Sequence, residues 1–256
     1  MMKLNYKEIG DQNKELVILH GLFGSSDNWL TIARQLTDEY KVYLLDQRNH
    51  GDSPHDPAHT YEAMAEDLKN FIVEHDLKEP HVLGHSMGGK TAMYFAVKYP
   101  SLFDKLVIVD IAPKSYPVHH DQILTGLKSI DLTQVKTRGE ADKQLAEYVP
   151  ELGVRQFLLK NLNRDANKSY SWKINLEVID KSIEKISEGL PQALHAPKEV
   201  LFVGGKNSHY IEQEDYATID QFFPGSQIEM VDGAGHWIHA EKPDEFLKIV
   251  RDFLSK

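Results

Sequence analysis

The chain has 256 residues, a length that fits one α/β domain with a modest insertion and leaves no room for two independent cores. Its composition, 41% hydrophobic and 27% charged, is that of an ordinary globular protein, and the absence of cysteine excludes disulfides, thiolate catalysis and sulfur-ligated metals. A formal net charge of −10 without a basic cluster argues against nucleic acid or an anionic membrane as a partner.

No apolar run reaches the roughly 18 residues that a membrane-spanning helix needs. The first eight residues alternate polar and apolar side chains and contain no hydrophobic signal core. We therefore expect a cytoplasmic protein without a membrane span.

Short apolar strands alternate with amphipathic helices along most of the chain. We expect strands at 3–9, 16–19, 41–46, 80–83, 105–110, 199–205 and 227–231, and helices at 27–36, 61–75, 91–97, 215–222 and 244–254. This alternation predicts an α/β fold, with a mostly parallel sheet covered by helices on both faces.

The alternation of strands and helices stops in the middle of the chain, where the sequence becomes charged and helical in character. We interpret residues 114–190 as an inserted helical cap, and residues 1–113 and 191–256 as the core that carries the sheet. Ligands of such sheets bind at the carboxyl ends of the strands, so this edge is where a functional site is expected.

The motif Gly84-His85-Ser86-Met87-Gly88 stands between an expected strand and an expected helix. In this context G-x-S-x-G describes a sharp turn that exposes a serine hydroxyl above the sheet edge. The glycines leave room for the tight turn, and the N–H groups that begin the helix point toward any oxyanion that the serine generates. Ser86 is therefore the candidate nucleophile.

A serine hydroxyl needs a neighbouring base, and His236 is the best placed of the 13 histidines. It follows the last expected strand in the loop 231–237, just before the final helix, and a histidine after the serine in chain order suits this topology.

The other histidines are assigned no chemistry. We expect His55, His59 and His75 at the solvated surface and His81 at a strand start. The pair His119-His120 and the pair His236 with His239 lack the carboxylate pattern of a zinc site, so we expect no metal and no cofactor.

Taken together, these motifs resemble the α/β-hydrolase family over nearly the whole chain. More closely, they are similar to those of bacterial YbfF-type esterases and their mitochondrial relatives. The matching segments are His20–Ser25 (HGLFGS), Asp46–Ser53 (DQRNHGDS), Gly84–Lys90 (GHSMGGK), Asp110–Pro113 (DIAP) and Gly233–Pro243 (GAGHWIHAEKP). The resemblance implies an α/β-hydrolase fold with Ser86 and His236 in a catalytic triad.

The acid of the triad departs from the wider family. Most α/β-hydrolases carry it in the loop after the strand that here contains 201–203, but residues 204–210 include neither Asp nor Glu. Asp110 ends a buried strand, where an unpaired carboxylate would be costly, so it is our first choice for the acid. Glu212 is the second choice, although it more readily starts the following helix, and a purely structural role for Asp110 stays open.

For the oxyanion, the resemblance and the motif imply the backbone N–H groups of Met87 and Phe23 as donors. Leu22 and Trp237 would line an apolar entrance together with those two residues, which suits an acyl or alkyl group. We interpret Arg48 and Asn49 as residues that structure their loop.

The sequence therefore predicts a serine carboxylesterase that hydrolyses small esters with short to medium acyl chains through an acyl-enzyme on Ser86, with thioesters as a further candidate class. Two alternatives stay open. The same scaffold could bind a small ligand as a receptor, or the same triad could run a lyase or perhydrolase reaction.

Overall fold

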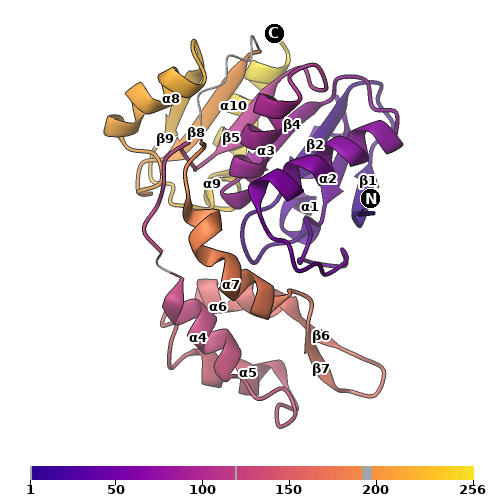
Figure 1. Ribbon diagram of the computed structural model, residues 1–256, viewed down its shortest axis with the longest axis vertical. Coiled ribbons are helices and arrows are strands. Elements are labelled where there is room, and N and C mark those ends of the chain that lie inside the picture. The colour runs from indigo at the N-terminus through magenta and orange to yellow at the C-terminus, as the bar shows by residue number, and fades with distance from the viewer. Residues whose placement is uncertain (1, 119, 192–197) are drawn as a thin grey trace.

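The computed structural model describes residues 2–118, 120–191 and 198–256. Figure 1 shows a sheet with helices on both sides and a separate group of helices at one end. The strands are β1 (Tyr6–Ile9), β2 (Glu15–Leu19), β3 (Lys41–Leu45), β4 (His81–His85), β5 (Leu106–Val109), β6 (Leu162–Arg164), β7 (Tyr170–Trp172), β8 (Val200–Gly205) and β9 (Gln227–Val231). The α-helices are α1 (Leu30–Leu36), α2 (Tyr61–Glu74), α3 (Met87–Lys98), α4 (Asp121–Ser129), α5 (Arg138–Leu145), α6 (Leu152–Leu158), α7 (Leu176–Ser187), α8 (Tyr216–Phe222), α9 (Ile238–Glu241) and α10 (Pro243–Leu254). Short 3-10 turns are η1 (Ser26–Trp29), η2 (Leu159–Asn161) and η3 (Gln213–Asp215).

The described residues form a seven-stranded sheet in the order β1-β3-β2-β4-β5-β8-β9. Strand β1 pairs antiparallel with β3, and the other neighbours pair in parallel. This topology confirms the expected mostly parallel sheet. Strands β4 and β5 are neighbours in register, with His85 opposite Val109, so the residues that follow them leave the sheet side by side.

Both faces of the sheet are buried because alternate side chains of each strand point to opposite layers. In β2, Val17 and Leu19 pack with the apolar faces of α2 and α3, whereas Leu16 and Ile18 pack with α1 and α10. The expected helices at 61–75 and 244–254 are therefore present, and both cover the sheet. The helix expected at 27–36 begins as the 3-10 turn η1 and becomes α-helical at Leu30.

The segment from α4 to α7 adds no strand to the sheet and lies below it in Figure 1. Its apolar side chains form a cluster of their own, which also includes Phe23, Tyr61 and Met87 from the neighbouring elements. The segment is mostly helical, and it also contains an antiparallel hairpin of β6 and β7, which the sequence analysis did not anticipate. Each of these strands has three residues, too few for a period-two pattern to be visible in the sequence.

The chain returns to the sheet after α7 through a stretch whose carbonyl groups are held by side chains of α2 and α3. Tyr61 donates to the carbonyl of Ile186 at 2.6 Å, and Tyr94 donates to that of Gly189 at 3.4 Å. The buried Lys90 amine donates to the two carbonyls between them, those of residues 187 and 188. These bonds satisfy carbonyl groups that a helix end leaves without intrahelical partners.

Among the described residues, no helix is both long and apolar enough to cross a bilayer.

Candidate active site

Ser86 occupies the turn between β4 and α3 with φ 53° and ψ −118°, a conformation that residues with a side chain rarely adopt. The flanking glycines permit this turn. A Cβ on Gly84 would lie 2.2 Å from the Gly88 carbonyl oxygen, and a Cβ on Gly88 would lie 2.5 Å from that of Leu19. The Ser86 N–H donates to the carbonyl of Val109 at 2.9 Å, which fixes the turn against the next strand.

Asp110 leaves β5 beside this turn and is completely buried. Its φ of 50° is again in the left-handed region, which indicates a backbone held by its surroundings. One carboxylate oxygen accepts from the Gly205 N–H at 3.0 Å, and the other accepts from the Ser208 hydroxyl and from the ring of His236. Three donors therefore hold the carboxylate and offset the cost of burying it.

Two of these donors come from residues 204–210, the segment in which the resemblance led us to look for an acid. Here the loop supplies the Gly205 N–H and the Ser208 hydroxyl, which hold the carboxylate of Asp110. Sequence reasoning identified the missing acid but not these donors. A serine three residues after the last residue of the buried strand β8 was the available signal.

His236 lies after β9, and its Nδ1 is 2.7 Å from Asp110 Oδ2. Because a carboxylate can only accept, Nδ1 carries the hydrogen and Nε2 keeps its lone pair. The ring stacks on Tyr210 with a centroid distance of 4.1 Å, and the backbone carbonyl of His236 accepts from His85 Nε2 at 2.9 Å. The imidazole is thus oriented from one face, from one ring nitrogen and through its own backbone.

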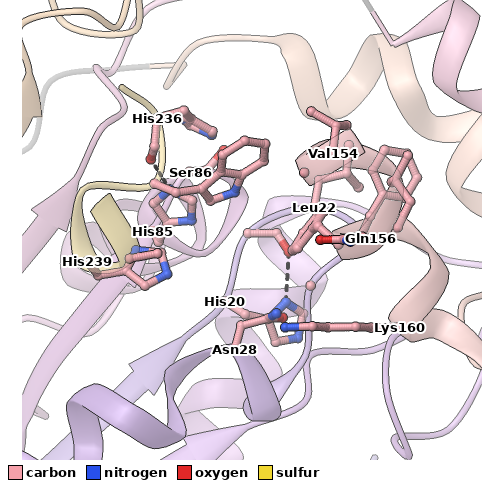
Figure 2. Close-up of a pocket in the computed structure, with 18 of the residues that line it drawn as sticks. His20, Leu22, Asn28, His85, Ser86, Val154, Gln156, Lys160, His236 and His239 are labelled. Atoms are coloured by element: carbon pink, nitrogen blue, oxygen red, sulfur yellow. Dashed lines mark hydrogen bonds between the residues drawn. The ribbon is translucent and has the colours of Figure 1, made fainter. Parts of the chain in front are cut away.

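Ser86 and His236 line one cavity of about 590 Å³ (Figure 2). Leu22 and Trp237, both expected at an apolar entrance, also line it. Figure 2 shows Ser86 and His236 on one side and residues of α6 with Lys160 on the other, so the cavity lies between the sheet edge and the segment 114–190. No hydrogen bond joins the Ser86 hydroxyl to the described His236 ring; such bonds often tighten only when substrate binds.

Two further histidines, His85 and His239, lie near the ring of His236. Burial, and then the charge of His236, holds the pKa of His85 well below its ordinary value and lowers the pKa of His239 to about 3. His239 stacks on Trp29 with a centroid distance of 4.0 Å. Both of these neighbouring imidazoles are therefore neutral near pH 7.

The two expected oxyanion donors differ in the structure. Met87 begins α3, so its N–H has no intrahelical acceptor, and its side chain lines a narrow recess beside Ser86. The Phe23 N–H, by contrast, donates to His50 Nε2 at 3.2 Å and is already occupied. The assignment of Phe23 is therefore at odds with this conformation. Leu22, one residue earlier, lines both the main cavity and the recess together with Ser86.

Arg48 and Asn49 structure their loop, as expected. The buried Arg48 guanidinium donates to both carboxylate oxygens of Asp67, at 2.6 and 2.9 Å, and the Asn49 side chain accepts from the Asp56 N–H at 2.8 Å. Glu212 lies at the start of the following helical turn, as the sequence analysis favoured over a role as the acid. It precedes η3, and its carboxylate lies 3.0 Å from the ring of His209.

The expectation for His59 is wrong, because this residue is 1% exposed and packs against His50. Burial lowers its pKa to about 4.

His55 is exposed and His75 is half-buried. His120 lines the main cavity, whereas His119 lies outside the described residues. Within the described ranges, no group of three or more His, Asp or Glu side chains is arranged to hold a metal ion.

A model of the α/β hydrolase fold matches residues 15–243. The sn-1-specific diacylglycerol lipase ABHD11 of Xenopus laevis is 40% identical over 248 residues, which cover 94% of this chain and 79% of the relative. Esterase YbfF of Escherichia coli K12 is 36% identical over 261 residues, which cover 99% of this chain and all of the relative.

Among solved structures, a marine microorganism esterase superimposes with a TM-score of 0.95 at 42% identity, covering 99% of this chain and 100% of the other. The family model spans most of the chain, and the relatives align over nearly its full length. The chain therefore belongs to the α/β-hydrolase family and within it groups with the carboxylic ester hydrolases.

Proposed function

We propose that this protein is a serine carboxylesterase in which Ser86 is the nucleophile, His236 the base and Asp110 the acid that orients the base. The observation that carries the proposal is the bond of 2.7 Å between His236 Nδ1 and the buried Asp110 carboxylate, in a cavity that also contains the strained Ser86. The bond leaves Nε2 free to take the proton of the serine hydroxyl.

In the first step Ser86 Oγ attacks the ester carbonyl and its proton passes to His236 Nε2. The resulting imidazolium is stabilised by Asp110, and the oxyanion is stabilised by N–H donors at the turn. His236 then protonates the leaving alcohol, and the acyl group stays on Ser86. In the second half the same histidine activates water, which releases the acid and regenerates the hydroxyl.

We assign the oxyanion donors to the N–H groups of Met87 and Leu22. The Met87 N–H is a free helix N-terminal donor, and Leu22 borders the same recess as Ser86. We do not assign this role to Phe23, because its N–H donates to His50.

We infer that residues 114–190 act as a cap that shapes the substrate site, because Val154, Phe157 and Leu158 contribute apolar walls to the cavity. These walls suit esters with short to medium acyl chains, and thioesters are an alternative substrate class. The relatives named as an esterase and as a diacylglycerol lipase support ester hydrolysis.

The test combines a fluorophosphonate probe with p-nitrophenyl esters of two to twelve acyl carbons. We expect the probe to label Ser86, turnover to peak at a short or medium chain, and Ser86→Ala to abolish both signals. Ser129→Ala is the control, because this hydroxyl donates to the Gly126 carbonyl and does not line the cavity. Ligand binding without a Ser86 acyl-enzyme by mass spectrometry would favour a receptor. A Ser86-dependent lyase or perhydrolase product without ester turnover would favour the other alternative.

A further inference from the structure

Each of the two peptide groups that flank Phe23 forms a hydrogen bond with a buried side chain. The Phe23 N–H donates to His50 Nε2 at 3.2 Å, and its carbonyl accepts from Asn161 Nδ2 at 2.7 Å. All three residues are buried, with exposed fractions of 3%, 0% and 3%. Phe23 itself has φ 59°, which is strained for an aromatic residue and costs on the order of 1–3 kcal/mol. A strained conformation of this kind persists only where its surroundings enforce it.

His50 is built as a fixed acceptor. Its Nδ1 lies 3.0 Å from the carbonyl of Arg48 and donates to it, so Nε2 carries the lone pair that receives the Phe23 N–H. Burial, together with the neighbouring His20 and His59, holds the pKa of His50 well below its ordinary value. The ring is therefore neutral over the whole neutral range, and Arg48 is itself anchored to Asp67.

Asn161 belongs to η2, within the segment between α4 and α7. Its Nδ2 donates to the carbonyls of both Phe23 and Leu158, at 2.7 and 3.1 Å. The Phe23 side chain packs into the apolar cluster of the same segment. The carbonyl and the ring of Phe23 therefore contact the cap, whereas its N–H donates to a residue of the core.

We propose that His50 and Asn161 are positioning residues that clamp the oxyanion loop. The clamp fixes the two peptide planes that flank Phe23. The second of these planes carries the Gly24 N–H, which donates at 3.0 Å to the Gly21 carbonyl, and that carbonyl shares its peptide plane with the Leu22 N–H. The clamp therefore holds the direction of the Leu22 N–H through this turn. Full turnover then requires that the cap is docked, because one half of the clamp comes from η2. This inference rests on the proposed serine esterase function and on Leu22 as an oxyanion donor.

The principal test is Asn161→Asp, which keeps the size of the side chain but replaces the Nδ2 donor by an acceptor. We expect kcat to fall by about a hundredfold, the scale for a misplaced catalytic group, while KM changes by less than about threefold. Asn163→Asp is the matched control, because Asn163 lies two residues away in β6 with an exposed side chain, and it should leave both constants unchanged.

The second arm is His50→Phe against His50→Gln. Gln can present an oxygen near the position of Nε2, so it should recover most of the activity that Phe loses. A trifluoromethyl ketone, which forms a tetrahedral oxyanion on the serine, should lose affinity in the Asn161→Asp and His50→Phe variants by the same factor as kcat/KM. A non-reactive methyl ketone of the same shape should bind unchanged.

The experiments distinguish a failure of the esterase function from a failure of the clamp. If wild-type turnover does not depend on Ser86, the esterase function is wrong. If turnover depends on Ser86 but folded Asn161→Asp keeps its kcat, or if both ketones lose affinity equally, the clamp is wrong. Should His50→Phe fail to fold, the Asn161→Asp result and its control decide the question alone.

Discussion

Replacing Asp110 by Asn gives the sharpest test of the acid. The carboxylate accepts from the Gly205 N–H, from the Ser208 hydroxyl and from His236 Nδ1. An amide has one oxygen and one NH2 group in place of the two oxygens. If its oxygen faces Gly205, the NH2 group faces His236 and forces Nδ1 to accept. The imidazole hydrogen then moves to Nε2, where the base needs a lone pair.

The reverse orientation of the amide is disfavoured. Its NH2 group would face the Gly205 N–H, and two donors meeting in a buried site cost about 1–3 kcal/mol. The wrong tautomer therefore dominates, and the stabilisation of the imidazolium by a full negative charge is also lost. Serine triads lose on the order of a thousandfold to ten-thousandfold in kcat by such a change, which corresponds to about 4–5.5 kcal/mol of activation free energy.

The assay is kcat for the best p-nitrophenyl ester, with circular dichroism to verify the fold. Glu212→Gln is the control and should stay within about twofold of wild type, because Glu212 contacts His209 and precedes η3. A folded Asp110→Asn enzyme that kept more than a tenth of the wild-type kcat would refute the role of Asp110. A large loss in Glu212→Gln instead would move the acid to that residue.

Three further changes test the packing around the site. In Gly205→Ala the new Cβ would lie 2.3 Å from the Gly235 carbonyl oxygen, so the loop 231–237, which carries His236, must shift. We expect at least a tenfold loss of kcat; unchanged kinetics would contradict this reasoning. Arg48→Met leaves Asp67 buried without its cation and should lower the free energy of unfolding by about 3–5 kcal/mol in urea titrations; a loss below about 1 kcal/mol would contradict this reasoning. Burial lowers the pKa of Lys90 from 10.5 to about 7, so between these values the unfolded chain binds a proton that the folded chain lacks. Wild-type stability should therefore rise with pH across that window relative to Lys90→Met, and a constant difference between the two proteins would rule this out.

The sheet and the residues around Ser86 could be predicted because their signals are local. The apolar strands, the G-x-S-x-G turn and the acid at the end of β5 each lie within a few consecutive residues. Once parallel strands are inferred, their carboxyl ends meet at one edge, and Ser86 and Asp110 follow neighbouring strands. His236 could be chosen by its place after the last strand.

The errors arise where distant segments meet. His59 appeared in a polar stretch typical of the surface, yet the loop folds inward and buries it. The Phe23 N–H donates to His50, 27 residues away, and the Phe23 carbonyl accepts from Asn161, 138 residues away. No local pattern encodes such pairings, because the first depends on how two loops of the core pack together and the second on how the segment 114–190 packs on the sheet edge.

The two loops that meet at Asp110 also bear on how a proposed triad of this kind can change. The Ser208 hydroxyl donates to the same Asp110 oxygen that accepts the hydrogen bond from His236 Nδ1. Side chains from the ends of β5 and β8 therefore converge on a single point in space. A lineage could transfer its carboxylate from one strand end to the other by two substitutions while the serine, the histidine and the backbone stay in place. For a chain of this kind, the position of the carboxylate in space is therefore more informative about the role of an acid than its position in the sequence.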